Sequence, residues 1–426
     1  MLTYKAEPSS TSDSEIAEYR RTARSWLAQS LERRDGRSRR HHIEYYTPEV
    51  MAANRELQRR LFEAGYAGIT WPVEYGGQGL STEHEAAFYQ EAADYVLPDF
   101  GALGNTTFYT CAPTMLAHAS AQFLVSFIPK VLAGQALVCQ FFSEPSSGSD
   151  LAGIRLRAAR QDGGWLLNGQ KMWSTFAHLA DWGLCLARTN WDVPKHRGLT
   201  WFVVPCDSRG LTIRPIRQIN QSLEFCEEFF DDVAVPPESV IGKINGGWEV
   251  AQTMLLFERG AGRPSESEEL APPGPVAPEL VRLAREAGKS GNPVIRQKIA
   301  QSHVIDVVEQ ALKFRTGKRA RLQDANPGIP AYPKLFRGTY DPIRARIAVE
   351  VGGASAMTWD TTDPDGAERS LAYLDARIGS IAGGTNEMQR NGIGERVLGL
   401  PREPATDIEQ PFKDVASIRE NRRGDQ

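Results

Sequence analysis

Apolar residues recur along the chain with two different periods, and the change of period divides it into three parts. Apolar positions three to four residues apart, as in Ile16, Tyr19, Ala23 and Leu27, predict helices at 14–65, 82–95 and 112–132. Short apolar runs punctuated by Asp, Gly and Pro predict strands at 182–188, 199–204, 211–215 and 227–235. The helical period returns after Gly246, with helices expected at 248–262, 279–287, 294–322, 343–351, 366–381 and 386–398. The pattern predicts an α+β chain with domains at 1–134, 135–243 and 244–426.

The stretch from Cys139 to Thr175 predicts a small antiparallel sheet whose loops are rich in hydroxyl groups. It holds or adjoins three strand-like runs, at 137–142, 155–160 and 165–167. Asp162-Gly163-Gly164 lies between the last two runs and Asn168-Gly169 follows the third. Asn, Asp and Gly tolerate the positive φ of tight turns, so both segments are expected to be hairpin turns. An ordinary hairpin with solvated Ser-rich turns is the simplest interpretation of such a pattern.

Trp173 argues for more than an ordinary hairpin. It places a large aromatic face at a strand end, directly before the hydroxyl groups of Ser174 and Thr175. A flat heteroaromatic cofactor needs a face to pack against and hydrogen-bond donors at its edge. The stretch therefore predicts a cofactor site on strand-end loops.

Composition excludes several other classes of protein. The chain has 426 residues, 41% of them hydrophobic and 24% charged, with a net charge of −4, so no basic excess indicates nucleic-acid binding. No apolar run approaches the roughly 18–20 residues that span a bilayer, and the polar N-terminus lacks a secretory segment. The five cysteines are scattered and mostly lie in apolar runs, which predicts buried free thiols and a cytoplasmic protein. No histidine spacing predicts a metal site.

Glu258 is the candidate general base. On a helix from Trp248, it lies on one stripe with Trp248, Ala251 and Leu255, whereas Glu249 has polar neighbours. A carboxylate on an apolar stripe loses solvation, which raises its pKa towards the range that a base needs near neutral pH. The alternative is a structural ion pair with an arginine of another helix.

Four ordered segments resemble motifs of the acyl-CoA dehydrogenase family, over roughly residues 50–400. They are GYAGITWPVEYGGQGLS at 65–81, SEPSSGSDLA at 143–152, NGQKMWST at 168–175 and FFDDVAVPPESVIG at 229–242. Ser147 replaces the family's usual Ala. The resemblance implies an N-terminal α-helical domain, a central β-sandwich or barrel domain and a C-terminal four-helix bundle. It also implies a homotetramer assembled as a dimer of dimers.

The resemblance also implies a reaction. Members of the family abstract the α-proton of an acyl-CoA thioester while hydride leaves the β-carbon for flavin N5, giving the trans-2-enoyl-CoA. The base commonly precedes Gly-Thr near the C-terminus, but that position is Gly383. Leu255-Leu-Phe-Glu-Arg259 matches the placement in the isovaleryl- and long-chain enzymes, so Glu258 is the expected base and Arg259 is expected to line the site. Glu387 is the nearby rival, at a position that faces the cofactor in the family.

The resemblance implies FAD as cofactor and electron-transfer flavoprotein as the acceptor of electrons. Phe142, Ser143, Gly148 and Ser149 would line one side of the flavin, and Trp173, Ser174 and Thr175 would cover the ring edge. Gly384, Thr385 and Glu387 would contact the flavin or its diphosphate from a loop before a helix. Ser149 would also lie near the CoA chain.

Three positions depart from the family pattern at the adenine end of the FAD site. The segment 314–321 lacks the motif R-x-x-F-G, Val349 stands for Gln, and Leu374 stands for Arg. Weak FAD binding, a variant pocket or a heteromeric enzyme would each explain them. Two further alternatives are a non-catalytic subunit of such a complex and a relative that uses flavin for oxygen chemistry, as a monooxygenase or oxidase. A base on the earlier helix favours a bulky acyl group, such as a branched, long or polycyclic chain.

Overall fold

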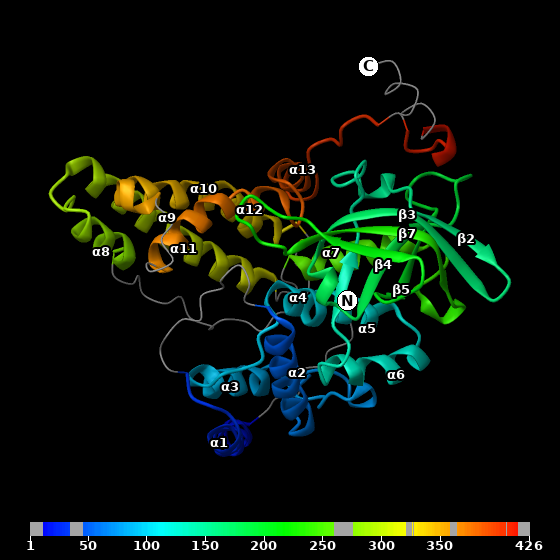
Figure 1. Ribbon diagram of the computed structural model, residues 1–426, viewed down its shortest axis with the longest axis horizontal. Coiled ribbons are helices and arrows are strands. Elements are labelled where there is room, and N and C mark those ends of the chain that lie inside the picture. The colour runs from blue at the N-terminus through cyan, green and yellow to red at the C-terminus, as the bar shows by residue number, and fades with distance from the viewer. Residues whose placement is uncertain are drawn as a thin grey trace. The chain divides into compact units, whose positions relative to one another are not determined.

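The computed structural model describes residues 12–34, 46–259, 276–320, 326, 328–357, 364–405 and 407–415. Two compact units divide the chain, one formed by 1–264 with 405–426 and the other by 265–404. The first unit holds helices α1–α7 and all the strands among the described residues, and the second holds helices α8–α13 (Figure 1). Pro, Gly and acidic residues predict a loop-like segment at 263–293, and its residues 263–275 lie outside the described residues.

Short helices form the N-terminal part of the first unit: α1 (Asp13–Ser30), α2 (Pro48–Glu63), α3 (Thr82–Glu91), α4 (Gly101–Thr106), α5 (Ala112–His118) and α6 (Ala121–Leu132). The hydroxyl groups of Ser12 and Thr47 accept hydrogen bonds from the first turns of α1 and α2, which explains where these helices begin. A π-helical segment, Thr107–Cys111, joins α4 to α5. No pattern in the sequence indicated that segment.

The strands form one sheet in the order β6-β7-β3-β2-β4-β5-β8, with β1 beside β4. Their bounds are β1 (Val138–Phe141), β2 (Arg157–Gln161), β3 (Gly164–Thr175), β4 (Trp182–Arg188), β5 (Leu199–Pro205), β6 (Leu211–Pro215), β7 (Phe225–Val235) and β8 (Val240–Ile241). Most pairs are antiparallel, as predicted, but β1 and β2 each pair with β4 in parallel. The turn at Asp162-Gly163 between β2 and β3 is confirmed.

The second predicted turn is wrong. Asn168-Gly169 lies inside β3, where the pairing with β7 shifts register between Leu167 and Gly169. Asn168 instead bonds across the strands, since its Nδ2 donates to Asp232 Oδ1 at 2.8 Å and its Oδ1 accepts from the Asp232 N–H at 3.0 Å. The same residue chemistry that suits a turn here makes a β-bulge.

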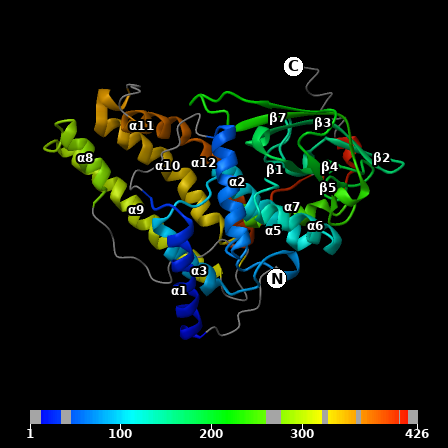
Figure 2. The same cartoon turned by 60° about the horizontal axis from the view of Figure 1, so that its bottom comes forward.

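Helices cover one face of the sheet (Figures 1 and 2). Val138 of β1 shares a hydrophobic cluster with Cys111 and with Met254 of α7 (Gly247–Glu258), whereas Cys139 and Phe141 belong to a second cluster. Thr107 joins the π-helical segment to β1, because its hydroxyl accepts from the Val138 N–H at 2.8 Å and donates to the Val138 carbonyl at 3.1 Å. The alternation along β1 therefore directs Val138, Gln140 and Phe142 towards the helices.

The second unit consists of α8 (Pro278–Glu286), α9 (Pro293–Ala320), α10 (Ala331–Gly352), α11 (Pro364–Asp375), α12 (Ile378–Ile381) and α13 (Asn386–Arg396). α10 begins twelve residues before the predicted helix 343–351, and one predicted helix, 366–381, is two helices. Pro342 lies inside α10 and Gly338 is buried there. Both residues disfavour helix in isolation, and packing of α10 against its neighbours overrides that preference.

The polar sequence after Pro401 predicts a tail that docks loosely or frays, but part of this segment is firmly docked. Phe412 is 2% exposed and Val415 is 6% exposed, and the segment belongs to the first unit. Residues 416–426 lie outside the described residues. Among the described helices, none has the length and apolar character to cross a bilayer.

Candidate functional site

The loop after β1 carries four of the predicted cofactor residues. The Phe142 ring packs on Trp201, with ring centroids 5.0 Å apart, and Ser143 is half-buried. Gly148 and Ser149 are exposed, and nothing lies within 4 Å of a Cβ built on Gly148. The loop thus presents an aromatic edge and an open stretch of backbone side by side in the chain.

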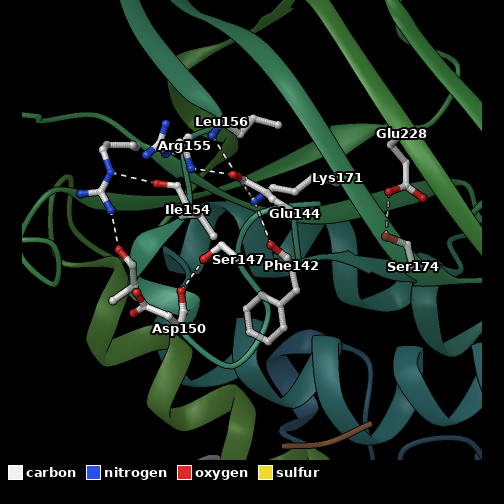
Figure 3. Close-up of polar contacts among 12 residues, drawn as sticks. Phe142, Glu144, Ser147, Asp150, Ile154, Arg155, Leu156, Lys171, Ser174 and Glu228 are labelled. Carbon is white, nitrogen blue, oxygen red and sulfur yellow. Dashed lines mark hydrogen bonds and ion pairs between the residues drawn. The ribbon is translucent and has the colours of Figure 1, made fainter. Parts of the chain in front are cut away.

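A buried ion pair holds this loop against β3 (Figure 3). Lys171 Nζ lies 2.9 Å from Glu144 Oε1 and donates to the Phe142 carbonyl at 2.9 Å, and the Lys171 and Glu144 side chains are 0% and 5% exposed. Glu144 also accepts the N–H groups of Arg155 at 2.6 Å and Leu156 at 2.8 Å. One carboxylate therefore fixes both ends of the loop to β3, and sequence reasoning did not single out either residue of the pair.

Trp173 lies on a second bulge of β3, where the register with β7 shifts between Met172 and Ser174. Its φ is +68°, in the left-handed region that residues other than Gly rarely adopt. Its side chain is 52% exposed and meets the Phe225 ring edge-on, with centroids 6.0 Å apart. Strained backbone and an exposed indole at one position are typical of a ligand contact.

Ser174 faces the other way from Trp173. It is 3% exposed, and its hydroxyl donates to Glu228 Oε2 of β7 at 3.0 Å (Figure 3). Glu228 is fully buried, burial raises its pKa to about 8, and its Oε1 has no hydrogen-bond partner. The structure therefore groups the Ser174 hydroxyl with a buried acid that sequence reasoning missed, while the neighbouring Thr175 is half-buried.

Gln140 is a further residue that sequence reasoning missed. It lies on β1 two residues before Phe142, on the face that turns towards the helices, and its Nε2 is buried without a hydrogen-bond partner. A buried donor without a partner costs about 1–3 kcal/mol. The atom is explained if a ligand supplies the acceptor, and an unpaired polar atom cannot be read from sequence alone.

Glu258 is the last residue of α7, and Arg259 forms the C-terminal cap of that helix. The side chains of Val250, Met254 and Phe257 are at most 2% exposed, Glu258 is half-buried, and Glu249 is exposed. Burial raises the pKa of the Cys111 thiol well above its usual value, and the charge of Glu258 raises it further. α7 packs against the π-helical segment, which itself contacts β1 through Thr107.

The remaining predicted residues lie in the second unit. Gly383 and Gly384 have φ of +66° and +87°, and Gln389 Nε2 donates to both of their carbonyls. Thr385 caps α13, since its hydroxyl accepts from the Met388 N–H at 3.2 Å. The Glu387 side chain is 76% exposed and pairs with Arg390 at 3.5 Å. Exposure of this kind makes Glu387 a poorer candidate for a base than the half-buried Glu258.

The five cysteines are free, and all except the half-buried Cys206 are buried, as predicted. Across the described ranges no three His, Cys, Asp or Glu side chains gather as they would around a metal ion. The first unit thus combines an exposed indole, an unpaired amide donor and an open Gly-Ser loop, together with a half-buried carboxylate on a helix. These groups suit a flat heteroaromatic ligand and a proton transfer.

Family models match nearly the whole chain in three consecutive parts. The acyl-CoA dehydrogenase N-terminal, middle and C-terminal domains match residues 13–135, 139–233 and 245–398. The models support a chain of three parts, and the domain boundaries after 134 and 243 stay predictions.

Known relatives agree with the family models. The chain is 35% identical over 402 residues to the acyl-CoA dehydrogenase IpdE1 of Mycobacterium tuberculosis, covering 91% of this chain and 99% of that protein. The crystal structure of the ChsE4–ChsE5 complex from Mycobacterium tuberculosis is similar at 26% identity, with a TM-score of 0.68 over 93% of this chain and 100% of that one. A structure of the Tcur3481–Tcur3483 steroid ACAD shares the fold at 22% identity, with a TM-score of 0.70 over 92% and 99%. The ordered motifs, the fold and these matches together place the chain in the acyl-CoA dehydrogenase family.

Proposed function

We propose that this acyl-CoA dehydrogenase oxidises the α,β carbon–carbon bond of an acyl-CoA thioester to the trans-2-enoyl-CoA, with Glu258 as the base that takes the α-proton. The proposal rests on which residues occupy the two positions where the family places its base. Position 383 is a glycine, whereas Glu258 is a half-buried carboxylate beside Met254 and Phe257. A carboxylate at the end of a buried helix face has the partial desolvation that proton abstraction near neutral pH requires.

The residues present fit FAD, the cofactor of the family. Bound FAD supplies the acceptor for the hydride that leaves the β-carbon. The Trp173 indole offers a face for the flavin ring, and Phe142, Ser143, Thr175 and Gln140 offer an apolar edge and donors around it. In the second unit, Gly384, Thr385 and Glu387 are the residues that the family resemblance assigns to the same cofactor.

The exposed loop residues Gly148 and Ser149 suit the diphosphate of FAD or the pantetheine of CoA, because backbone N–H groups and a hydroxyl bind such groups without a bulky side chain. Arg259 follows the base directly and is proposed to line the acyl-CoA site. Electron-transfer flavoprotein is the proposed acceptor of the two electrons. We also propose a cytoplasmic homotetramer as the working form.

The proposed substrate class is a bulky acyl-CoA, including acyl chains that carry a polycyclic steroid. Two points support it: the proposed base Glu258 lies on α7, and the fold is like that of a protein described as a steroid ACAD. Anaerobic titration with short, branched, long and polycyclic acyl-CoAs, read as loss of flavin absorbance, measures the preference. Faster reduction by a straight short-chain acyl-CoA than by any bulky one would contradict it.

Glu258→Gln tests the base. We expect a yellow protein with the FAD content of the wild type in which acyl-CoA no longer bleaches the flavin, because the amide cannot accept the α-proton. Glu387→Gln is the matched control, and it should retain bleaching. Loss of bleaching in the control with full activity in Glu258→Gln would transfer the role to Glu387.

A second candidate function is that of one subunit in a heteromeric acyl-CoA dehydrogenase. Two observations favour it: Val349 and Leu374 at positions where the family has polar FAD contacts, and the likeness to a complex of two different proteins, ChsE4 and ChsE5. Purification of this chain alone, followed by its mass in solution and its ratio of FAD to protein, separates the two forms. A colourless protein of a single kind of chain would favour the heteromeric form, and a yellow tetramer would favour the homotetramer.

A further inference from the structure

The segment Asp407–Val415, here called the C-terminal strap, lies on the β-domain of the first unit and beyond the range of the C-terminal family model, which ends at 398. Two main-chain hydrogen bonds hold it, from the Phe412 N–H to the Val193 carbonyl at 2.9 Å and from the Lys413 N–H to the Trp191 carbonyl at 3.0 Å. Phe412 is 2% exposed. The strap is thus a docked part of the domain although the whole second unit separates it in sequence.

Under Phe412 lies Arg188, the last residue of β4. Its Cζ is 3.6 Å from the centroid of the Phe412 ring, and the side chain is fully buried. Arg188 Nε donates to the Ile154 carbonyl at 3.0 Å, and its two terminal nitrogens donate to the carbonyls of Ala152 at 2.6 Å and Lys195 at 3.2 Å. A buried guanidinium needs these acceptors and the aromatic cover, so the strap completes the surroundings of the group that holds residues 152–154.

Lys195 makes a second connection between the strap and the same loop. Its Nζ lies 3.2 Å from Asp150 Oδ1 and 3.2 Å from Asp407 Oδ2, and its side chain is 13% exposed. Asp150 directly follows Ser149 in the chain. One ammonium group therefore links the strap to the residue next to the predicted ligand contact.

The loop Ser147–Ile154 is exposed at Gly148 and Ser149 and buried at Leu151, Ala152 and Ile154. Ser147 and Glu144 exchange two backbone hydrogen bonds, at 2.9 and 3.0 Å. The Ser147 hydroxyl donates to the Asp150 carbonyl (Figure 3). Arg188 bonds to the carbonyls of Ala152 and Ile154, and Lys195 pairs with Asp150. Together with the buried side chains of Leu151 and Ile154, these contacts fix the part of the loop that follows Gly148 and Ser149.

We propose that the C-terminal strap positions the loop Ser147–Ile154, acting through Arg188 and Lys195, and so presents Gly148 and Ser149 to the acyl-CoA or FAD. Phe412, Arg188, Lys195 and Asp407 are positioning residues in this proposal. The part of it that concerns ligands rests on the proposed function, whereas the part that concerns the loop does not.

The test compares Phe412→Ala and Asp407→Asn with Lys413→Ala in the full chain. Lys413 lies on the same strap but pairs with Asp192 through side chains that are 56% and 74% exposed, so its removal leaves Arg188 and Lys195 untouched. The rate of hydrogen exchange in the peptide covering 147–156 measures how well the loop is ordered. Flavin absorbance reads bound FAD, and kcat and KM are measured with the acyl-CoA that the wild type prefers.

We expect faster exchange over 147–156 in Phe412→Ala and Asp407→Asn and wild-type exchange in Lys413→Ala. We also expect KM to rise about tenfold with kcat within about twofold, a change equivalent to ~1.4 kcal/mol of ground-state binding. Lys195→Arg should retain the wild-type loop, since the charge remains. A general loss of folding would instead accelerate exchange throughout the β-domain. Asp407→Asn is the milder of the two strap variants, because it removes only one charge from a half-buried side chain, so it is expected to leave the rest of the domain folded.

Wild-type exchange over 147–156 in both strap variants would overturn the proposal, and so would a loosened loop with unchanged KM and unchanged FAD content. A wild-type protein that oxidises no acyl-CoA would refute the proposed function. The exchange comparison would then still decide whether the strap orders the loop.

Discussion

Replacing Lys171 by Met tests whether the buried pair with Glu144 holds in place the loop after β1, which carries four of the predicted cofactor residues. Methionine keeps the length and volume of the lysine stem but removes the ammonium group, which contacts Glu144 and the Phe142 carbonyl at 2.9 Å each. The Glu144 carboxylate then stays buried at 5% exposure with two backbone N–H donors and without its Lys171 ion pair. Removing one partner of a buried pair destabilises a protein by about 3–5 kcal/mol.

This energy corresponds to a large shift in thermal stability. A domain of roughly 150–250 residues loses about 2–4 °C of its unfolding midpoint per kcal/mol, so we expect a decrease of about 6–20 °C. Circular dichroism follows unfolding of the chain, and flavin fluorescence follows release of FAD. Because Lys171 also anchors the Phe142 carbonyl, we expect FAD to leave before the chain unfolds.

Two further variants separate the pair from lysine itself. In Lys171→Met with Glu144→Gln no unpaired charge remains, so the double variant should be more stable than Lys171→Met alone. Arg59→Met removes an exposed cation that pairs with Glu56 at 2.7 Å, and it should shift the midpoint little because water screens that pair. A midpoint for Lys171→Met within about 2 °C of the wild type would refute the reasoning.

The other predictions concern single residues around the site. Burial raises the pKa of Glu228 to about 8 from an ordinary 4.5, so the native protein holds an extra proton between these values. Its stability should therefore fall as pH rises through that window, by up to ~1.4 kcal/mol per pH unit, and Glu228→Gln should flatten the difference between urea midpoints at about pH 5 and pH 8. Gln140→Leu should stabilise the FAD-free protein, because it removes an unpaired buried donor, yet weaken FAD binding about tenfold in a calorimetric titration; tighter FAD binding would contradict that role. Trp173→Gly should relieve the left-handed backbone and remove the indole face, so the visible spectrum of bound flavin should shift while thermal stability holds; an unchanged spectrum would place the flavin elsewhere.

Local sequence patterns predicted many helices and strands, because in those elements the apolar positions are the ones that face the core. The predicted strand 182–188 coincides with β4, whose side chains from Gly183 onward are all buried. The predicted helix around Glu258 and the exposed Glu249 also agree with α7. In these elements the apolar period and the core face coincide, so sequence alone indicates both the element and its orientation.

The misses share a physical cause, which is that tertiary contacts decide between two local options. Asn168-Gly169 suits a turn as well as a bulge, and pairing with Asp232 of β7 selects the bulge. The first half of α10 contains Pro and Gly, and only its neighbours make it helical. In the sequence, Phe412 is an apolar residue in a mostly polar tail. Only the fold brings the Arg188 guanidinium against its ring.

The sequence also could not indicate the direction of the side chains at the site. Ser174 follows Trp173 in the motif and shares its predicted role, but the bulge between Met172 and Ser174 turns the hydroxyl to Glu228. Glu144, Lys171 and Gln140 lie inside or beside the motifs, yet no period or spacing distinguishes a buried pair or an unpaired amide from solvated residues. Their roles depend on burial and distance, which appear only once the strands are paired.

The backbone at Gly383 bears on how an enzyme of this kind could change the place of its base during evolution. A glutamate at that position would have to adopt φ near +66°, at a cost of about 1–2 kcal/mol for an L-residue, while Gln389 Nε2 donates to the carbonyls of Gly383 and Gly384. A single substitution to glutamate would therefore place a carboxylate on strained backbone. If the base is Glu258 of α7, as proposed, the left-handed backbone at Gly383 adds a conformational cost to any move of that base to the C-terminal loop.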